Sequence, residues 1–92
     1  MAEKTVRKEI TFTGRVQGVG FRYRAKHAAN TFMVTGWVKN EWDGSVVMEA
    51  QGTEDQINQV LKYINSSPYI DIDRIRYREL PLAEGEYGFH VR

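Results

Sequence analysis

Apolar and polar residues alternate along the chain from Val6 to Val16. Every second position over this stretch is apolar except Lys8 and Gly14, which leaves the apolar set Val6, Ile10, Phe12 and Val16. The positions between them are polar: Arg7, Glu9, Thr11 and Thr13. Because successive side chains of a strand point to opposite faces of a sheet, the alternation predicts a β-strand with one buried face.

Two later stretches carry apolar residues at the three- and four-residue spacing of a helix. The first stripe is Phe21, Ala25, Ala28 and Phe32, and the second is Ile57, Val60, Leu61 and Ile64. Thr53 and Gln56 match a capping box before the second stripe, and Ser-Ser-Pro at residues 66–68 ends it. Each stripe therefore predicts a helix that buries one side.

Between the two helical stripes, Asp43-Gly44 separates two apolar runs. Asp-Gly is typical of the two-residue type I′ turn, which needs positive φ at both central positions. We therefore expect a β-hairpin over residues 34–51, with Trp37 packed and Trp42 partly exposed.

The C-terminal part of the chain returns to an extended pattern from Ile70 to Leu80. The apolar parity changes between Ile72 and Ile75, which predicts a bulge or a strand start near Asp73. A last alternation predicts a short final strand through Tyr87, Phe89 and Val91.

The predicted order is β-α-β-β-α-β followed by one short strand. This order is typical of the α+β class, and specifically of a ferredoxin-like split βαββαβ sandwich with an antiparallel or mixed sheet. Both helices are expected on one face of that sheet, since both stripes must be buried. With 92 residues, the chain is expected to form a single domain over residues 1–92. Such a fold hosts many functions, so the chemistry must come from particular residues.

The charge balance, the absence of cysteine and the N-terminal segment limit which partners and which chemistry we expect. The 13 Lys+Arg residues nearly balance the 12 Asp+Glu residues, giving a formal charge of +1, so we expect no nucleic-acid partner bound through bulk charge. The sequence has no cysteine, which excludes disulfides and thiolate chemistry and fits a cytoplasmic location. The charged N-terminal segment lacks the apolar core of a signal peptide, and we expect no membrane partner.

The stretch "GRVQGVGFR", residues 14–22, joins the first predicted strand to the first predicted helix. Gly18 and Gly20 allow successive N–H groups to point inward at a helix N-terminus, which would form a nest for an anion. Arg22 in the first helical turn is unfavourable by a few tenths to about 1 kcal/mol unless an anion lies nearby. A glycine-rich turn with a solvated arginine explains the same residues, so local physics leaves both interpretations open.

"GRVQGVGFR" and "GWVKNEWDGSVVMEAQG" together resemble the two signature stretches of the acylphosphatase family, and the resemblance extends over residues 8–92. It implies the same ferredoxin-like fold. It also implies hydrolysis of the carboxyl–phosphate anhydride of acyl phosphates, without metal or cofactor. The substrate would be a small acyl phosphate, and inorganic phosphate or sulfate would bind as product or inhibitor. Separately from the resemblance, we expect a monomer, although the sequence leaves the oligomeric state open.

The resemblance also implies residue roles. The phosphate-binding arginine of the family falls on Arg22 and its water-orienting asparagine on Asn40. Its cradle of main-chain N–H groups falls on Gln17, Gly18, Val19, Gly20 and Phe21. Three positions depart from the usual pattern: Met33 replaces a frequent glycine, Arg24 an apolar residue and Lys39 a frequent arginine. On its own, Asn40 would be interpreted as a hairpin residue.

Two rival functions use the same elements. An RNA-recognition module stacks bases on strand aromatics, which the strand "SVVMEAQG" lacks. A regulatory domain could keep the anion site without turnover. We expect no catalytic role for His27 or His90 and no magnesium site at Asp71 and Asp73. Arg74, Arg76 and Arg78 are expected to pair with acidic residues across the sheet.

Overall fold

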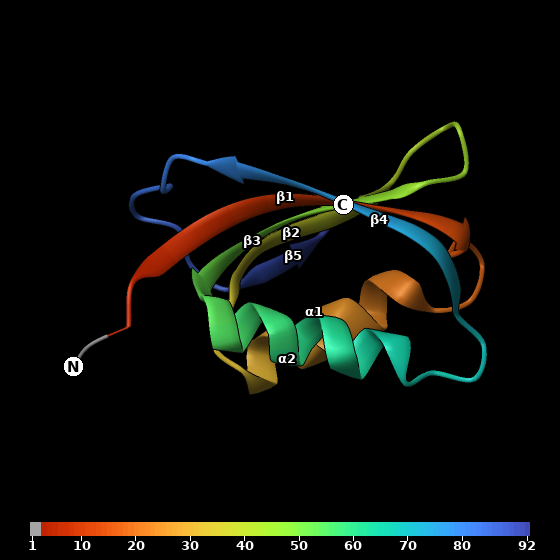
Figure 1. The fold of residues 1–92 in the computed structure, drawn as a ribbon, viewed down its shortest axis with the longest axis horizontal. Coiled ribbons are helices and arrows are strands. Elements are labelled where there is room, and N and C mark those ends of the chain that lie inside the picture. The colour runs from red at the N-terminus through yellow and green to blue at the C-terminus, as the bar shows by residue number, and fades with distance from the viewer. Residues whose placement is uncertain (1–2) are drawn as a thin grey trace.

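Figure 1 shows one curved sheet with both helices packed against the same face. The computed structural model describes residues 3–92. The predicted domain of residues 1–92 begins with Met1 and Ala2, which lie outside the described residues. In chain order the elements are β1 (Thr5–Arg15), α1 (Phe21–Thr31), β2 (Thr35–Asn40), β3 (Val46–Thr53), α2 (Glu54–Asn65), β4 (Asp71–Leu80) and β5 (Phe89–Val91).

The sheet has the strand order β4-β1-β3-β2-β5. β1 is antiparallel to both β3 and β4, β2 is antiparallel to β3, and β2 is parallel to the short β5. A mixed sheet with two helices on one face confirms the predicted ferredoxin-like α+β sandwich.

The core lies between the helical stripes and the covered face of the sheet. The predicted core residues that are buried include Val6, Ile10, Phe12, Val16, Phe21, Ala25, Ala28, Ile57, Val60 and Ile64, whereas Phe32 and Leu61 are partly buried. The rings of Phe12 and Phe21 meet edge to face with centroids 4.8 Å apart, a geometry that adds about 0.5–1.5 kcal/mol to their burial. Because Phe21 begins α1, this contact holds the start of the helix against β1.

The predicted bulge near Asp73 is confirmed. Thr13 of β1 lies opposite Arg74 of β4, and the next residue, Gly14, lies opposite Ile72, so Asp73 is the extra residue. A Cβ at Gly14 would lie 2.3 Å from the Asp71 carbonyl oxygen, and its φ is 123°. Glycine is therefore required where β4 approaches the end of β1.

The predicted hairpin is present, but the predicted type I′ turn is wrong. The Gly44 N–H donates to the Glu41 carbonyl at 3.2 Å, and the Glu41 N–H donates to the Ser45 carbonyl at 2.8 Å. Gly44 has a φ of 95°, whereas Asp43 is not in the left-handed region. The Asp43 carboxylate accepts hydrogen bonds from the N–H and hydroxyl of Ser45, at 2.9 and 2.7 Å. These bonds favour a type I turn followed by a left-handed glycine, and Trp42 in that turn is fully exposed rather than partly so.

The end of α1 shows why glycine is frequent at the position that Met33 occupies. Met33 has a φ of 60°, the left-handed conformation that usually favours glycine after a helix. The Val34 N–H donates to the Ala29 carbonyl at 2.8 Å, which closes the last turn of the helix. Methionine keeps this ending at a cost of roughly 1–2 kcal/mol.

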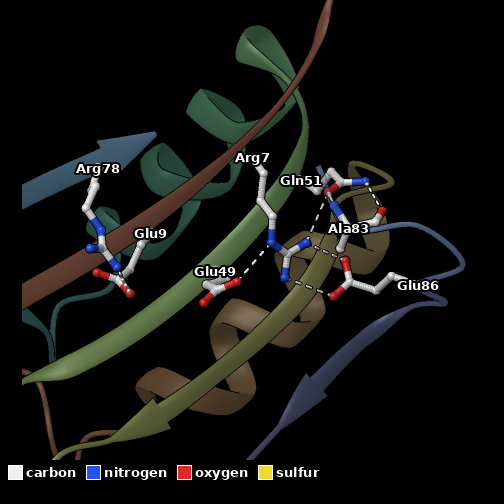
Figure 2. Close-up of polar contacts among 7 residues, drawn as sticks. All are labelled: Arg7, Glu9, Glu49, Gln51, Arg78, Ala83 and Glu86. Carbon is white, nitrogen blue, oxygen red and sulfur yellow. Dashed lines mark hydrogen bonds and ion pairs between the residues drawn. The ribbon is translucent and has the colours of Figure 1, made fainter. Parts of the chain in front are cut away.

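The sheet face opposite the helices carries a polar cluster centred on Arg7 of β1 (Figure 2). Its guanidinium donates to both carboxylate oxygens of Glu86, at 2.8 and 3.1 Å, to Glu49 at 2.9 Å and to Gln51 at 3.1 Å. Gln51 in turn exchanges two hydrogen bonds with the main chain of Ala83. The cluster therefore fastens the segment between β4 and β5 to the middle of the sheet.

Candidate active site

A small cavity of about 120 Å³ lies where the segment after β1 meets the start of α1 and the end of β2. We call residues 16–20, which join β1 to α1, the cradle loop, and this hollow the cradle cavity. In Figure 1 the cradle loop and the β2–β3 hairpin lie at the same end of the sheet. The residues lining the cavity are Val16, Gly18, Gly20, Phe21, Arg22, Tyr23 and Asn40.

Most of the predicted site residues meet at this cavity. Arg22, Asn40, Gly18, Gly20 and Phe21 all line it. The other two predicted residues, Gln17 and Val19, belong to the same loop but do not line the cavity, and Val19 packs against the core.

Val16 and Tyr23 also line the cavity, although sequence reasoning gave them no part in the site. Val16 was expected only in the core, where it is indeed buried. The position of Tyr23, directly after Arg22 in the first helical turn, was the available signal.

The cradle loop offers several main-chain donors to the cavity. Within residues 3–92, no protein group accepts a hydrogen bond from the main-chain N–H groups of residues 17–20. The first helical bond of α1 runs from the Arg24 N–H to the Gly20 carbonyl at 3.0 Å, so the three preceding N–H groups have no partner within the helix. Gly18 and Gly20 adopt positive φ, 73° and 79°, and left-handed residues of this kind bend a loop so that its successive N–H groups can point inward.

The two helices begin in opposite ways. At α2 the Thr53 hydroxyl accepts from the Gln56 N–H, and the Gln56 side chain accepts from the Thr53 N–H, which confirms the predicted capping box. At α1 the cap residue is Gly20, no side chain caps the helix, and the first turn holds no acidic residue. The positive end of the α1 dipole is therefore left for a ligand rather than neutralised by the protein.

Arg22 adds a full positive charge beside these donors. Its Nη1 donates to the main-chain oxygen of Arg92 at 3.0 Å, a contact between segments that no local pattern could predict. Within the described chain, Arg22 forms no ion pair with Asp or Glu. Its remaining donors are therefore available to an anion in the cavity, in the two-pronged geometry that suits a phosphoryl group.

Asn40 supplies an acceptor on the other side of the cavity. Its Oδ1 is buried and, within residues 3–92, has no hydrogen-bond partner. A buried acceptor without a partner costs about 1–3 kcal/mol, so this atom is suited to hold a water molecule or ligand.

Arg24 lies close to Arg22 in sequence but has a structural role. It donates to the Tyr63 carbonyl at 3.0 Å and to the Ser66 hydroxyl at 2.8 Å, with its guanidinium 4.2 Å from the centre of the Tyr63 ring. A cation at the end of α2 is favourable. Arg24 therefore joins the two helices and does not line the cradle cavity.

The remaining polar residues singled out in the sequence lie away from the cavity lining. The His27 ring lies beside the Tyr63 ring, tilted by 43° and with ring centres 5.6 Å apart, and His90 Nε2 lies 2.8 Å from the Tyr87 carbonyl.

Of the three arginines on β4, Arg78 pairs with Glu9 at 3.1 Å as expected. Arg74 and Arg76 form no ion pair within residues 3–92, so that expectation was wrong for them. The Arg92 guanidinium lies over the Trp37 ring, with its central carbon 4.6 Å from the ring centre.

A larger hollow, of about 420 Å³, lies between α2 and β4. Its polar side chains, Lys62, Asn65, Asp73 and Arg74, are all exposed to solvent. Unlike the cradle cavity, it therefore presents no buried group aimed at a ligand.

Two further properties concern the described residues as a whole. Nowhere in residues 3–92 do three or more His, Asp or Glu side chains gather in a way that could hold a metal ion. Neither helix in this part of the chain is long and apolar enough to cross a membrane.

The fold and the cradle cavity define a class of protein: an α+β sandwich whose strand-to-helix loop combines free main-chain donors with an arginine. The acylphosphatase family model matches residues 8–91. The chain is 47% identical over 91 residues to the acylphosphatase of Salinibacter ruber, covering 98% of this chain and 94% of that protein. It is 41% identical over 83 residues to the acylphosphatase of Clostridium acetobutylicum, covering 89% and 91%.

A solved structure agrees with the sequence relatives. The crystal structure of acylphosphatase from Bacillus subtilis superimposes with a TM-score of 0.86 at 35% identity, covering 95% of this chain and 98% of that one. The chain therefore belongs to the acylphosphatase family.

Proposed function

We propose that this protein hydrolyses acyl phosphates to a carboxylate and inorganic phosphate. Membership of the acylphosphatase family supports the reaction class. The observation that carries the mechanism is the cradle cavity, which brings Arg22 and the cradle loop together with a buried Asn40 oxygen that has no hydrogen-bond partner among residues 3–92.

In this proposal the cradle loop and Arg22 bind the phosphoryl group. The main-chain N–H groups of residues 17–21 surround its oxygens, and Arg22 contacts two of them. Phosphoryl transfer mainly requires positioning and stabilisation of charge, and preorganised donors supply both. The negative charge of the substrate also compensates the positive end of α1.

Asn40 acts on the attacking water. Its Oδ1 accepts a hydrogen bond from a water molecule and holds that water in line with the phosphorus atom and the leaving oxygen. The water oxygen bonds to phosphorus, the bond from phosphorus to the acyl oxygen breaks, and the carboxylate leaves with the electron pair. The displaced water proton passes to solvent or to the product phosphate. A carboxylic acid has a pKa of about 4, so the leaving group needs no general acid.

The proposal includes no metal and no cofactor, because Arg22 and the main-chain dipoles meet the charge of the phosphoryl group. Hydrolysis of acetyl phosphate should therefore proceed with a chelator present. Activity lost on chelation and restored by Mg²⁺ would refute this part. We propose a single-domain monomer that acts in the cytoplasm, a location that the cysteine-free composition fits.

The decisive experiment concerns Asn40→Ala. The turnover number should fall by about two to three powers of ten, if water positioning contributes roughly 3–4 kcal/mol. Inhibition by inorganic phosphate should be nearly unchanged, since Arg22 and the cradle loop remain. Asn58→Ala, which alters an exposed asparagine of α2, is the matched control and should behave as the wild type. Normal turnover by a folded Asn40→Ala would reduce Asn40 to a hairpin residue.

A further inference from the structure

The side chain of Gln17 connects two segments that the proposed mechanism uses separately. Gln17 belongs to the cradle loop and is half-buried. Its Nε2 donates to the Glu41 carbonyl at 2.6 Å and to the Ser45 carbonyl at 2.9 Å. A primary amide has two N–H donors, so each carbonyl receives one of them.

The two acceptors close the turn between β2 and β3. The Ser45 carbonyl also accepts from the Glu41 N–H, and the Glu41 carbonyl also accepts from the Gly44 N–H. The Asp43 carboxylate accepts two hydrogen bonds from Ser45 within this turn, and these bonds lower the pKa of Asp43. The Gln17 side chain is therefore hydrogen-bonded to both ends of the turn that follows Asn40 in the sequence.

The relative position of these segments matters for the chemistry. The cradle loop and α1 would hold the phosphoryl group, whereas the end of β2 would hold the water. Attack requires the reacting atoms to approach within about 3–3.5 Å and in line, and a displacement of about 1 Å can lower a rate by roughly 100-fold. A direct link between the cradle loop and the hairpin fixes this distance.

We infer that Gln17 is a positioning residue, whose side-chain amide sets the hairpin that carries Asn40 at the correct distance from the phosphoryl-binding loop. The inference rests on the proposed function. It gives the side chain a role separate from that of its main-chain N–H. Glutamine suits the position because it brings two donors to two carbonyls. Glutamate would place only acceptors there, and methionine would keep the bulk without any donor.

The kinetic test compares Gln17→Met with Gln59→Met, which alters an exposed glutamine of α2. With acetyl phosphate as substrate, the turnover number of Gln17→Met should fall about tenfold, while the inhibition constant of inorganic phosphate changes less than about twofold. Gln59→Met should match the wild type in both quantities. A parallel loss of phosphate affinity in Gln17→Met would overturn the inference, since Gln17 would then serve the cradle itself.

A double-variant cycle tests whether Gln17 acts through Asn40. If it does, Gln17→Met should lower turnover little or not at all in the Asn40→Ala background, rather than by a further tenfold. Full multiplication of the two losses would overturn the inference. A wild-type protein that does not hydrolyse acetyl phosphate would overturn the proposed function as well, whereas an active wild type with an unaffected Gln17→Met would overturn the inference alone.

The wild-type protein offers a measurement that needs no folded variant. By nuclear magnetic resonance, the side-chain amide protons of Gln17 should exchange with solvent at least about tenfold more slowly than those of Gln59, because both are hydrogen-bonded. Equal exchange rates would show that the link between loop and hairpin is absent in solution and would overturn the inference.

Discussion

Arg7 and Arg22 have opposite surroundings in the same small domain. Arg7 has 5% of its side chain exposed, and carboxylates of Glu49 and Glu86 surround its guanidinium. The hydrogen bond with Glu86 raises the pKa of Arg7, against the opposing effect of burial. Arg22 is half-buried, and its guanidinium donates to a main-chain oxygen, that of Arg92.

The difference separates an arginine whose donors the protein itself satisfies from one that we propose to bind phosphate. The protein itself supplies acceptors for the donors of Arg7, so a further anion would gain little there (Figure 2). Arg22 instead adds charge to a helix start whose first N–H groups have no partner among the described residues and whose first turn holds no acidic residue. Such an arrangement is poor for stability alone and favourable once an anion is bound.

The largest expected effect comes from Arg22→Ala. Hydrolysis of acetyl phosphate should fall by about 10³-fold or more, because transition-state charge loses its main side-chain partner. Inhibition by phosphate should weaken in parallel, since we propose that Arg22 contacts the phosphoryl group in both the ground state and the transition state. Arg22→Lys should not recover full activity, because an ammonium cannot make the two-pronged contact. Steady-state kinetics with phosphate as inhibitor measures both quantities.

Arg24→Ala is the matched control for that variant. It removes a second arginine from the same helical turn, but one that binds Tyr63 and Ser66 on α2. Activity should stay within about twofold of wild type, since Arg24 does not line the cradle cavity. A comparable loss in both variants would show that general positive charge, and not Arg22 in particular, supports the reaction.

Arg7→Met should show the reverse of Arg22→Ala, with a large effect on stability and little effect on activity. It should lower the free energy of unfolding by about 2–3 kcal/mol, because Glu49 and Glu86 would keep their burial without a partner. Phosphate inhibition and turnover of the folded fraction should remain near wild type. Urea unfolding measures the change in stability, and kinetics at low temperature measures turnover and phosphate inhibition. Unchanged stability would contradict the structural role of Arg7.

Phosphate should stabilise the wild-type fold through Arg22. At a concentration 100 times its Kd, phosphate should add about 2.7 kcal/mol by mass action. That would raise the thermal midpoint by roughly 10–20 °C in a domain of this size. The shift should persist in Arg7→Met and shrink strongly in Arg22→Ala. A shift of equal size in both variants would place the phosphate elsewhere.

The smallest expected effect concerns acid stability. The hydrogen bond from Arg7 lowers the pKa of Glu86 below its ordinary value. A carboxyl with a depressed pKa in the folded state stabilises the fold above its unfolded pKa and loses that contribution as the pH falls through the folded value. Stability should therefore decline below about pH 4, and Glu86→Gln should have a shallower decline. Equal slopes for the two proteins, measured by unfolding at several pH values, would contradict the assignment.

Much of the fold was predictable because its signals are local. The alternation around Ile10, the capping box at Thr53 and the parity change at Asp73 can each be recognised from a few consecutive residues. The prediction of a type I′ turn was wrong because the Asp43 carboxylate accepts hydrogen bonds from Ser45. This side-chain contact outweighs the usual preference of Asp-Gly for a type I′ turn. The Arg7 cluster joins residues 79 positions apart, and alternation placed Arg7 only on a polar face.

The site was predictable to a different degree. The loop pattern indicated donors around Gly18 and Gly20, and the structure brings them together with Arg22. Only the family resemblance connected that loop with Asn40, because their proximity arises from the pairing of β1, β3 and β2. The roles of Arg22 and Asn40 stay predictions until the variants are measured.

The two edges of the sheet have a consequence for behaviour at high concentration. One edge is β5, which is only three residues long, and the other is the ten-residue β4. A long free edge can recruit a strand from another copy and begin aggregation. The bulge at Asp73 twists this edge, and its side chains include the charged residues Asp71, Asp73, Arg74, Arg76, Arg78 and Glu79. A second copy approaching along β4 would therefore meet an irregular, charged and hydrated strand, which disfavours the continuous intermolecular sheet of a fibril.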